Sequence, residues 1–204
     1  MKKHLLIIVT PIFIIILLAV FVLSNGYNNI QRQDENVNAR WSEVINQYQR
    51  RDDLVPNLVN TLRGYIEHEN KVLVDVTNAR AKVGSMQINT SSLNDLHQLI
   101  QFQSAQNELS SALSRLIVVS ERYPELKASG LFQNLQTQLE GTENRITVAR
   151  SRYVKSVEDY NILIRSFPSN LTAKLFSYQV KPNFTVDNEK SISKAPTVDF
   201  SSPH

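Results

Sequence analysis

The chain opens on an apolar run, and long stretches with regularly spaced apolar residues follow it. The run Leu5–Leu23 contains no charged side chain and consists mostly of Leu, Ile, Val and Phe. At about 1.5 Å per residue, a helix of this length crosses the hydrocarbon core of a bilayer. The pattern therefore predicts a transmembrane helix over residues 5–23, preceded by a short flank of residues 1–4.

A cleaved secretory signal is the alternative, because it also places basic residues such as Lys2 and Lys3 before an apolar run. This run is longer than the usual signal, and Val20–Asn25 offers no pair of small residues for cleavage. We therefore expect a retained anchor. The two lysines outweigh the flank after the run, where Arg32 and Arg40 stand beside two acidic residues, so the positive-inside rule places the following domain outside the cytoplasm.

The first of three amphipathic stretches begins just after the anchor. Its apolar positions are Ile30, Val37, Trp41, Val44, Tyr48, Val55, Leu58, Leu62 and Ile66. Successive positions lie three, four or seven residues apart, which is the seam of a coiled coil. Helical character continues to Gly84–Ser85, so we expect one very long helix. Because Pro56 removes a backbone donor, a kink or short break is expected near Asp53–Val55.

Two more helices follow. The second runs from about Ser92 to Glu121, where Tyr123–Pro124 stops it. The third has apolar or small residues from Phe132 to Phe167 at an average spacing of about 3.5 residues, the period of a left-handed supercoil. The polar residues Gln103, Gln106 and Thr142 interrupt these seams. Such interruptions fix the register of packed helices at some cost in stability.

The expected fold is all-α: an N-terminal transmembrane helix followed by an elongated antiparallel three-helix, coiled-coil-like bundle over residues 27–167. Helices joined by short breaks run up, down and up, and each buries its apolar stripe against the other two. Ser24–Gly26 is expected to link anchor and bundle. Residues 168–204 are expected to form a largely disordered tail. Within it, Leu171–Val180 is alternatively a short amphipathic turn that lies on the bundle or on lipid.

Composition excludes several classes of protein. Lys2 and Lys3 are two of the 22 basic residues, so 20 remain after the anchor against 19 acidic ones, a net charge of +1. No concentrated basic face is visible, so a nucleic-acid partner is not expected. The absence of Cys from the sequence rules out disulfides, thiolate metal ligands and Cys nucleophiles.

No catalytic or metal-binding motif is recognisable. The four His residues are scattered, and His68–Val72 lacks the second His of a zinc-protease helix. Gly-rich phosphate loops and nucleophile elbows are also missing from the sequence. An acid/base cluster at Glu67–Glu69 would suit a hydrolase, but consecutive helical residues point in different directions, which favours a solvated face. We therefore expect no enzyme, no cofactor, no metal and no small-molecule substrate.

A charged cluster is the one candidate site. It consists of Arg50, Arg51, Asp52 and Asp53, together with Glu143, Asn144 and Arg145 on the third helix. In a structural interpretation, these residues form ion pairs around Pro56 and between helices. In a functional interpretation, Arg50 or Arg51 docks on an acidic group of a partner protein.

Several strings in the sequence resemble the LemA family of bacterial membrane proteins. They are Tyr27–Asn28, Trp41–Ser42, Arg50–Val59, Gly64–Tyr65, His68–Glu69, Ala79–Arg80, Tyr123–Lys127, Thr142–Ile146, Ala149–Arg150, Tyr160–Asn161 and Phe167–Pro168. The resemblance runs from the anchor to about Phe167, after which the tail departs. It implies a single-pass protein of the bacterial inner membrane with a helical bundle. It implies no established biochemical activity, although relatives are often encoded near a membrane metallopeptidase.

The anchor, the heptads and the missing catalytic motifs together favour a non-enzymatic scaffold or adaptor of the cell envelope. Its expected partners are the lipid bilayer and either an envelope protein or a second copy of the chain. The alternative is a regulatory accessory to a membrane peptidase or an envelope-stress system, which rests on the resemblance alone.

Overall fold

The computed structural model describes residues 2–65, 69–86 and 95–184, with side chains from Thr10 onward. The helices are α1 (Lys2–Arg63), α2 (Asn70–Gly84), α3 (Leu96–Ser120), α4 (Pro124–Lys127), α5 (Gly130–Arg165) and α6 (Ser169–Leu175). No strand occurs in these parts of the chain. The expected all-α class, with one long apolar N-terminal helix and a packed helical bundle, is confirmed.

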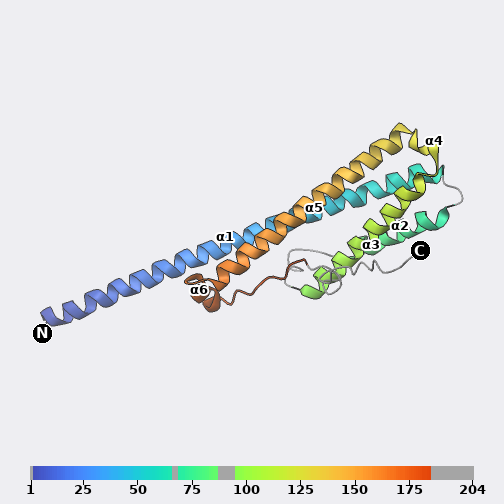
Figure 1. The fold of residues 1–204 in the computed structure, drawn as a ribbon. Helices are drawn as coiled ribbons and strands as arrows, with labels where there is room; N and C mark the ends of the chain where they lie inside the picture. The colour runs from blue at the N-terminus through green and yellow to red at the C-terminus, as the bar shows by residue number, and fades with distance from the viewer. Residues whose placement is uncertain (1, 66–68, 87–94, 185–204) are drawn as a thin grey trace, which may run out of the picture.

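Helix α1 runs without interruption from the apolar segment into the bundle, as Figure 1 shows. The expected linker at Ser24–Gly26 is therefore wrong, because these residues are helical. The expected break before Pro56 is also not observed. Proline cannot donate to the carbonyl four residues earlier, which belongs to Asp52. Arg80 of α2 donates its Nε–H to that carbonyl oxygen at 3.3 Å and thus replaces the missing donor.

The predicted first helix is too long, because α1 ends at Arg63 and α2 returns alongside it. The chain turns at Gly64–Tyr65, and Tyr65 donates its backbone N–H to the Leu62 carbonyl at 2.9 Å. Ile66, the last predicted seam residue, lies outside the described residues. The reversal changes the course of the chain from up, down and up to up, down, up and down. Consequently α5 descends toward the apolar end of α1.

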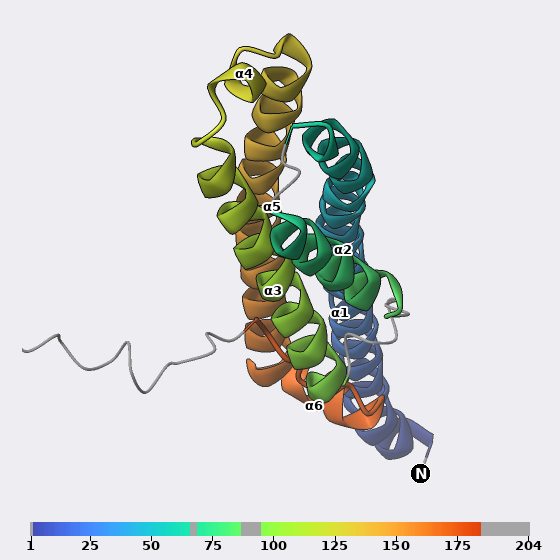
Figure 2. The ribbon, with the colours of Figure 1, turned by 90° about the vertical axis from the view of Figure 1, so that its right-hand side faces the viewer.

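Helices α1 and α5 form a long antiparallel pair, and α2 and α3 cover one side of its far half (Figures 1 and 2). Two apolar cores lie inside this arrangement. The core far from the apolar segment joins residues of α1, α2, α3, α4 and α5. The core nearer to it centres on Trp41, whose ring contacts those of Phe102 and Tyr153 at the α1–α3–α5 junction.

The first part of the predicted tail, up to Phe184, is ordered and packs on the bundle, in agreement with the alternative of a short amphipathic turn over Leu171–Val180 that lies on the bundle. The chain turns at the cis peptide Phe167–Pro168, forms α6 and continues as an irregular segment to Phe184. We call residues 176–184 the strap. Helix α6 packs on α1 and α5, and Tyr178 and Phe184 of the strap pack on the nearer core. The remainder of the predicted tail, residues 185–204, lies outside the described part of the chain.

Candidate functional site

Arg51 occupies the centre of the bundle, where α1, α3 and α5 meet. Its side chain is 1% exposed, although its neighbours Arg50 and Asp53 are exposed. A buried guanidinium requires hydrogen-bond partners, because its transfer from water into the protein interior is costly. The structure supplies them from two other helices.

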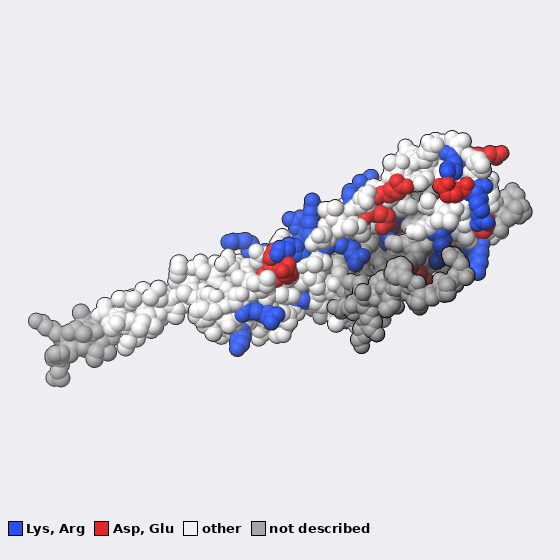
Figure 3. All heavy atoms as spheres, viewed as in Figure 1, with Lys and Arg blue, Asp and Glu red and all other residues white. Residues whose placement is uncertain are grey.

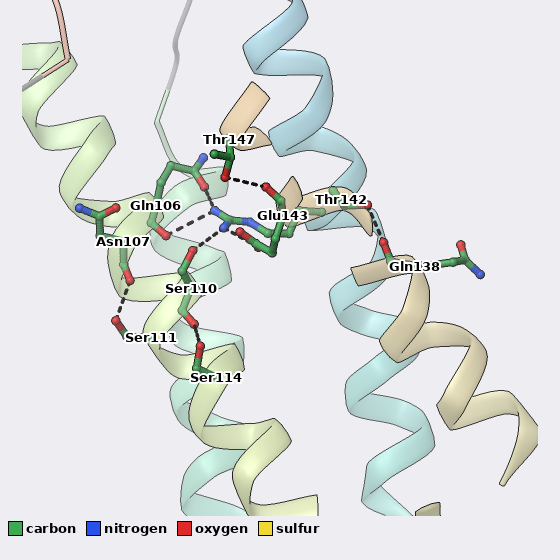
Figure 4. Close-up of polar contacts among 10 residues, drawn as sticks. Gln106, Asn107, Ser110, Ser111, Ser114, Gln138, Thr142, Glu143 and Thr147 are labelled. Carbon is green, nitrogen blue, oxygen red and sulfur yellow. Dashed lines mark hydrogen bonds and ion pairs between the residues drawn. The ribbon is translucent and has the colours of Figure 1, made fainter. Parts of the chain in front are cut away.

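Three side chains, which Figure 4 labels, bind the guanidinium group of Arg51: those of Gln106, Ser110 and Glu143. Nη1 donates to Ser110 Oγ at 2.5 Å and to Glu143 Oε1 at 2.9 Å. Nη2 donates to the side-chain oxygen of Gln106 and, at 3.3 Å, to the backbone carbonyl oxygen of the same residue. The arginine also lies 5.1 Å from the ring centre of Tyr48. Its Nε has no hydrogen-bond partner within the described residues.

The surroundings of Arg51 fit a structural role better than a role in acid/base catalysis. Arginine stays protonated and therefore cannot act as an acid or base at neutral pH. Burial raises the pKa of Tyr48, and the nearby Arg150 and Arg51 only partly offset this increase. The tyrosine thus remains neutral as well. Glu143 is 39% exposed and already paired with the arginine.

The other residues of the predicted cluster do not join this centre. Asp52 pairs with Arg80 of α2 at 3.2 Å instead. Arg145 donates to Gln47 at 3.2 Å and to Thr142 at 3.0 Å. Arg50, Asp53 and Asn144 are exposed on the surface. Of the seven predicted residues, the structure therefore brings together only Arg51 and Glu143.

The partners of Arg51 on α3 were not predicted from the sequence. Gln106 stood out as a polar interruption of an apolar seam, but its role as the acceptor for an arginine depended on the register of α1 against α3. Ser110 carried no signal, because serine is ordinary on a helix surface. No group of three or more His, Asp or Glu residues that would hold a metal occurs in the described parts of the chain.

A shallow groove lies between α3 and α5, beside this centre. It encloses about 530 Å³ and is lined by Ser110, Leu113, Ser114, Ile117, Leu139, Glu140, Glu143 and Asn144. Leucine and isoleucine side chains form its apolar part, and two carboxylates and an amide form its polar part. The groove therefore combines apolar surface with negative charge.

A second site lies where α6 meets α1. Gly26 is buried, and a Cβ atom placed on it would stand 2.5 Å from Oγ1 of Thr172. Only glycine permits so close an approach without displacement of the threonine. Thr172 and Ala173 are both buried in this contact. Gly26 is therefore the point on α1 against which α6 packs.

The strap then fastens α5 to α1 along the outside of the pair. Asn161 of α5 exchanges two hydrogen bonds of 2.9 Å with the backbone of Lys181. The ammonium group of Lys181 lies 2.9 Å from Asp34 of α1, and its side chain is only 9% exposed. Tyr160 donates to the Gln179 carbonyl at 3.2 Å. The strap thus bonds to both helices of the long pair.

The strap ends on the nearer core. The ring of Phe184 lies 5.9 Å from Trp41 and 5.3 Å from Tyr153, and Arg150 lies 4.5 Å above it. Asn183 and Phe184 were expected to be disordered, because the tail contains Pro182, Pro196 and Pro203 among many polar residues. An isolated aromatic residue in such a segment was the available signal.

From Thr10 to Val22, α1 stands apart from the bundle and carries no Lys, Arg, Asp or Glu (Figure 3). Its large apolar side chains from Ile12 to Val22 are exposed. Within the described residues, α1 carries the one stretch long and apolar enough to cross a membrane.

Comparison with known proteins agrees with these features. The model of the LemA family matches residues 40–200. The magnetosome protein MamQ 2 of Paramagnetospirillum magneticum is 23% identical over 192 residues, covering 86% of this chain and 70% of that protein. The protein LemA of Metamycoplasma hominis is 26% identical over 161 residues, covering 78% of this chain and 69% of that protein. The family match extends well past Phe167, where we expected the resemblance to end.

Proposed function

Because the chain belongs to the LemA family, we propose that it is a non-enzymatic scaffold of the bacterial cell envelope. One helix anchors it in the inner membrane, and its bundle presents a helical surface to another membrane protein. The observation that carries this proposal is the continuity of α1, which serves both as candidate span and as the longest helix of the bundle. A partner bound to such a bundle is held at a fixed height above the bilayer.

The interior of the bundle supports a structural role. Arg51 is the most polar feature of that interior, and Glu143, Ser110 and Gln106 already occupy its two Nη atoms. A general acid or base needs a group that titrates near neutral pH and reaches a substrate. An arginine side chain stays protonated in proteins and so does not supply such a group.

We assign the docking surface to the α3–α5 groove. Ile117 is partly exposed and supplies apolar contact above the buried Leu113 and Leu139, and Glu140 supplies a charge. Among the described residues Glu140 accepts a hydrogen bond from Gln136 at 3.0 Å and has no ion pair. A fitting occupant is an amphipathic helix of an envelope protein, with apolar residues three and four positions apart and a Lys or Arg beside them.

We further propose that the bundle lies outside the cytoplasm, because the positive-inside rule assigns Lys2 and Lys3 to the cytoplasmic side of the anchor. The cysteine-free sequence makes this testable with one cysteine introduced at the exposed Asn60. A membrane-impermeant maleimide should label N60C in spheroplasts, that is, in cells whose cell wall has been removed and whose inner membrane is intact. Labelling only after lysis would place the bundle in the cytoplasm.

Photo-crosslinking in the native membrane tests the docking surface. A photoreactive amino acid is placed at Asn144 in the groove, and the matched control places it at Asn60 on the exposed side of α1. We expect a discrete crosslinked protein from position 144 and none from position 60. Equal crosslinking from both positions, or none from either, would contradict the groove assignment. A membrane peptidase in the crosslinked band would instead favour the regulatory-accessory function.

A further inference from the structure

We infer that α6 is a second membrane contact, which lies in the headgroup layer of the bilayer that α1 spans and buries its outward side chains among phospholipid acyl chains. The inference rests on the proposed insertion of α1 and adds a site that anchoring by one helix does not require. Its evidence comes from the position, the exposed surface and the charge of α6.

The position of α6 is fixed by its contact with Gly26. Gly26 lies three residues beyond Leu23, where the apolar run ends. At the helical rise per residue, this separation is about 4.5 Å along the axis of α1. Interfacial helices sit about 5–10 Å deep at the boundary between headgroups and acyl chains. When α1 spans the bilayer, α6 therefore lies at the bilayer surface rather than above it.

The outward face of α6 and of the turn before it is apolar. Leu171 and Leu175 lie four residues apart on α6 and are 52% and 64% exposed, and Phe167, just before the helix, is 80% exposed. The inward face is formed by Thr172 and Ala173, which are buried. Scattered apolar residues are ordinary on protein surfaces, but a contiguous set marks an interaction site. This set adjoins the exposed apolar surface of the candidate span, so the same bilayer is the occupant that fits it.

A hollow between α1 and α6 continues this apolar surface. It encloses about 490 Å³ and is lined by Leu23, Ser24, Tyr27, Asn28, Leu175 and Phe176. The rings of Tyr27 and Phe176 lie 4.9 Å apart. Tyrosine concentrates at the membrane–water interface, because its ring is apolar and its hydroxyl is hydrated, and Tyr27 has this character, whereas Phe176 adds apolar surface. The hollow therefore has the composition expected for a site that takes a phospholipid acyl chain at the membrane surface.

The charges around α6 suit lipid phosphates. Residues 165–182 contain three basic residues and no acidic one. Lys181 is committed to Asp34, whereas Arg165 and Lys174 are exposed. Basic side chains at the bilayer surface are attracted to anionic phospholipids. Lys174 follows Leu171 by three positions, so it shares the side of α6 that faces lipid.

Depth measurement by spin labelling tests this inference on the full chain. Single cysteines at Leu171 and Leu175 carry a nitroxide, and the protein is reconstituted into vesicles of phosphatidylethanolamine with a minor fraction of phosphatidylglycerol. Leu17, 53% exposed in the candidate span, is the reference for depth. Leu131, 62% exposed at the opposite end of the bundle, is the matched control in water. The relaxation of each nitroxide is measured with oxygen, which concentrates in the bilayer, and separately with a water-soluble nickel chelate.

The measured quantity is the ratio of nitroxide relaxation by oxygen to relaxation by the nickel chelate. We expect this ratio at Leu171 and Leu175 to lie above the aqueous ratio at Leu131 and to approach the ratio at Leu17 inside the bilayer. Values equal to that of Leu131, while Leu17 is buried, would overturn the inference and leave the anchor intact. An aqueous value at Leu17 as well would overturn both the inference and the membrane-anchored function. Because the labelled positions are exposed, near-ultraviolet circular dichroism should show the same fold for every variant.

Discussion

Replacement of Arg51 by alanine tests whether the buried arginine holds the three long helices together. The substitution removes its hydrogen bonds to Ser110, Glu143 and Gln106 and leaves a cavity in place of a side chain that is 1% exposed. Loss of one partner from a buried ionic cluster costs about 3–5 kcal/mol. Two features favour the lower end: Glu143 is 39% exposed and regains water, and Nε of the arginine has no partner among the described residues. We therefore expect a loss of about 3 kcal/mol.

Thermal unfolding of the full chain in detergent, followed by circular dichroism at a helical wavelength, measures this loss. For a chain of this size, about 3 kcal/mol lowers the melting temperature by roughly 6–12 °C. Arg50→Ala is the matched control, because Arg50 is the adjacent residue and is exposed. It should change stability by less than about 0.5 kcal/mol. If R51A melts at the same temperature as R50A, the buried cluster does not stabilise the bundle and our reasoning is refuted.

Three further predictions concern the base of the bundle. Gly26→Ala should displace α6 and cost about 1–3 kcal/mol through overpacking against Thr172, measured by thermal unfolding, and Thr172→Ala should restore most of that loss in the double variant. An unchanged melting temperature in G26A would contradict the close contact. Lys181→Ala should cost about 1–2 kcal/mol and speed limited proteolysis of the strap, whereas the exposed Lys174→Ala should do neither. Burial raises the pKa of Tyr160 from 10.0 to about 12, so the folded state holds this proton more tightly than the unfolded state. The free energy of unfolding should be unaffected by Tyr160 below pH 10 and should fall between pH 10 and about pH 12. Tyrosinate absorbance measures the deprotonation, and circular dichroism measures the loss of helix. Deprotonation of all tyrosines near pH 10 with no loss of helix would contradict this prediction.

The seams of the helices were predictable because burial imposes a repeat on the sequence. Ile30, Val37, Trp41, Val44 and Tyr48 are all buried, as their spacing predicted. The reversal after Arg63 was not predictable in the same way. Leu73 and Val76 continue the apolar spacing beyond the turn and are buried too, but in a separate helix. A heptad pattern records which residues are buried and carries no information on whether the helix continues or folds back.

The site was predictable only in part, for a related reason. Arg51 and Glu143 were chosen as charged residues on different helices, and they do meet. The partner of Asp52 is Arg80, which depends on the unforeseen return of α2. The part of the strap beyond Val180 was not predicted, because an irregular segment has no sequence repeat and its order comes from contacts with residues far away in sequence, such as that of Lys181 with Asp34.

Because α1 is uninterrupted, a tilt of its membrane-spanning segment also tilts the bundle that it carries. From Leu23 to Arg63 the helix rises about 60 Å. Transmembrane helices tilt by about 20° on average, and a span longer than the hydrocarbon core tilts further when the membrane thins. A tilt of about 20° moves the far tip of a rod of this length by roughly 20 Å sideways. Local bilayer thickness is thereby converted into the lateral position of the distal end, near α4.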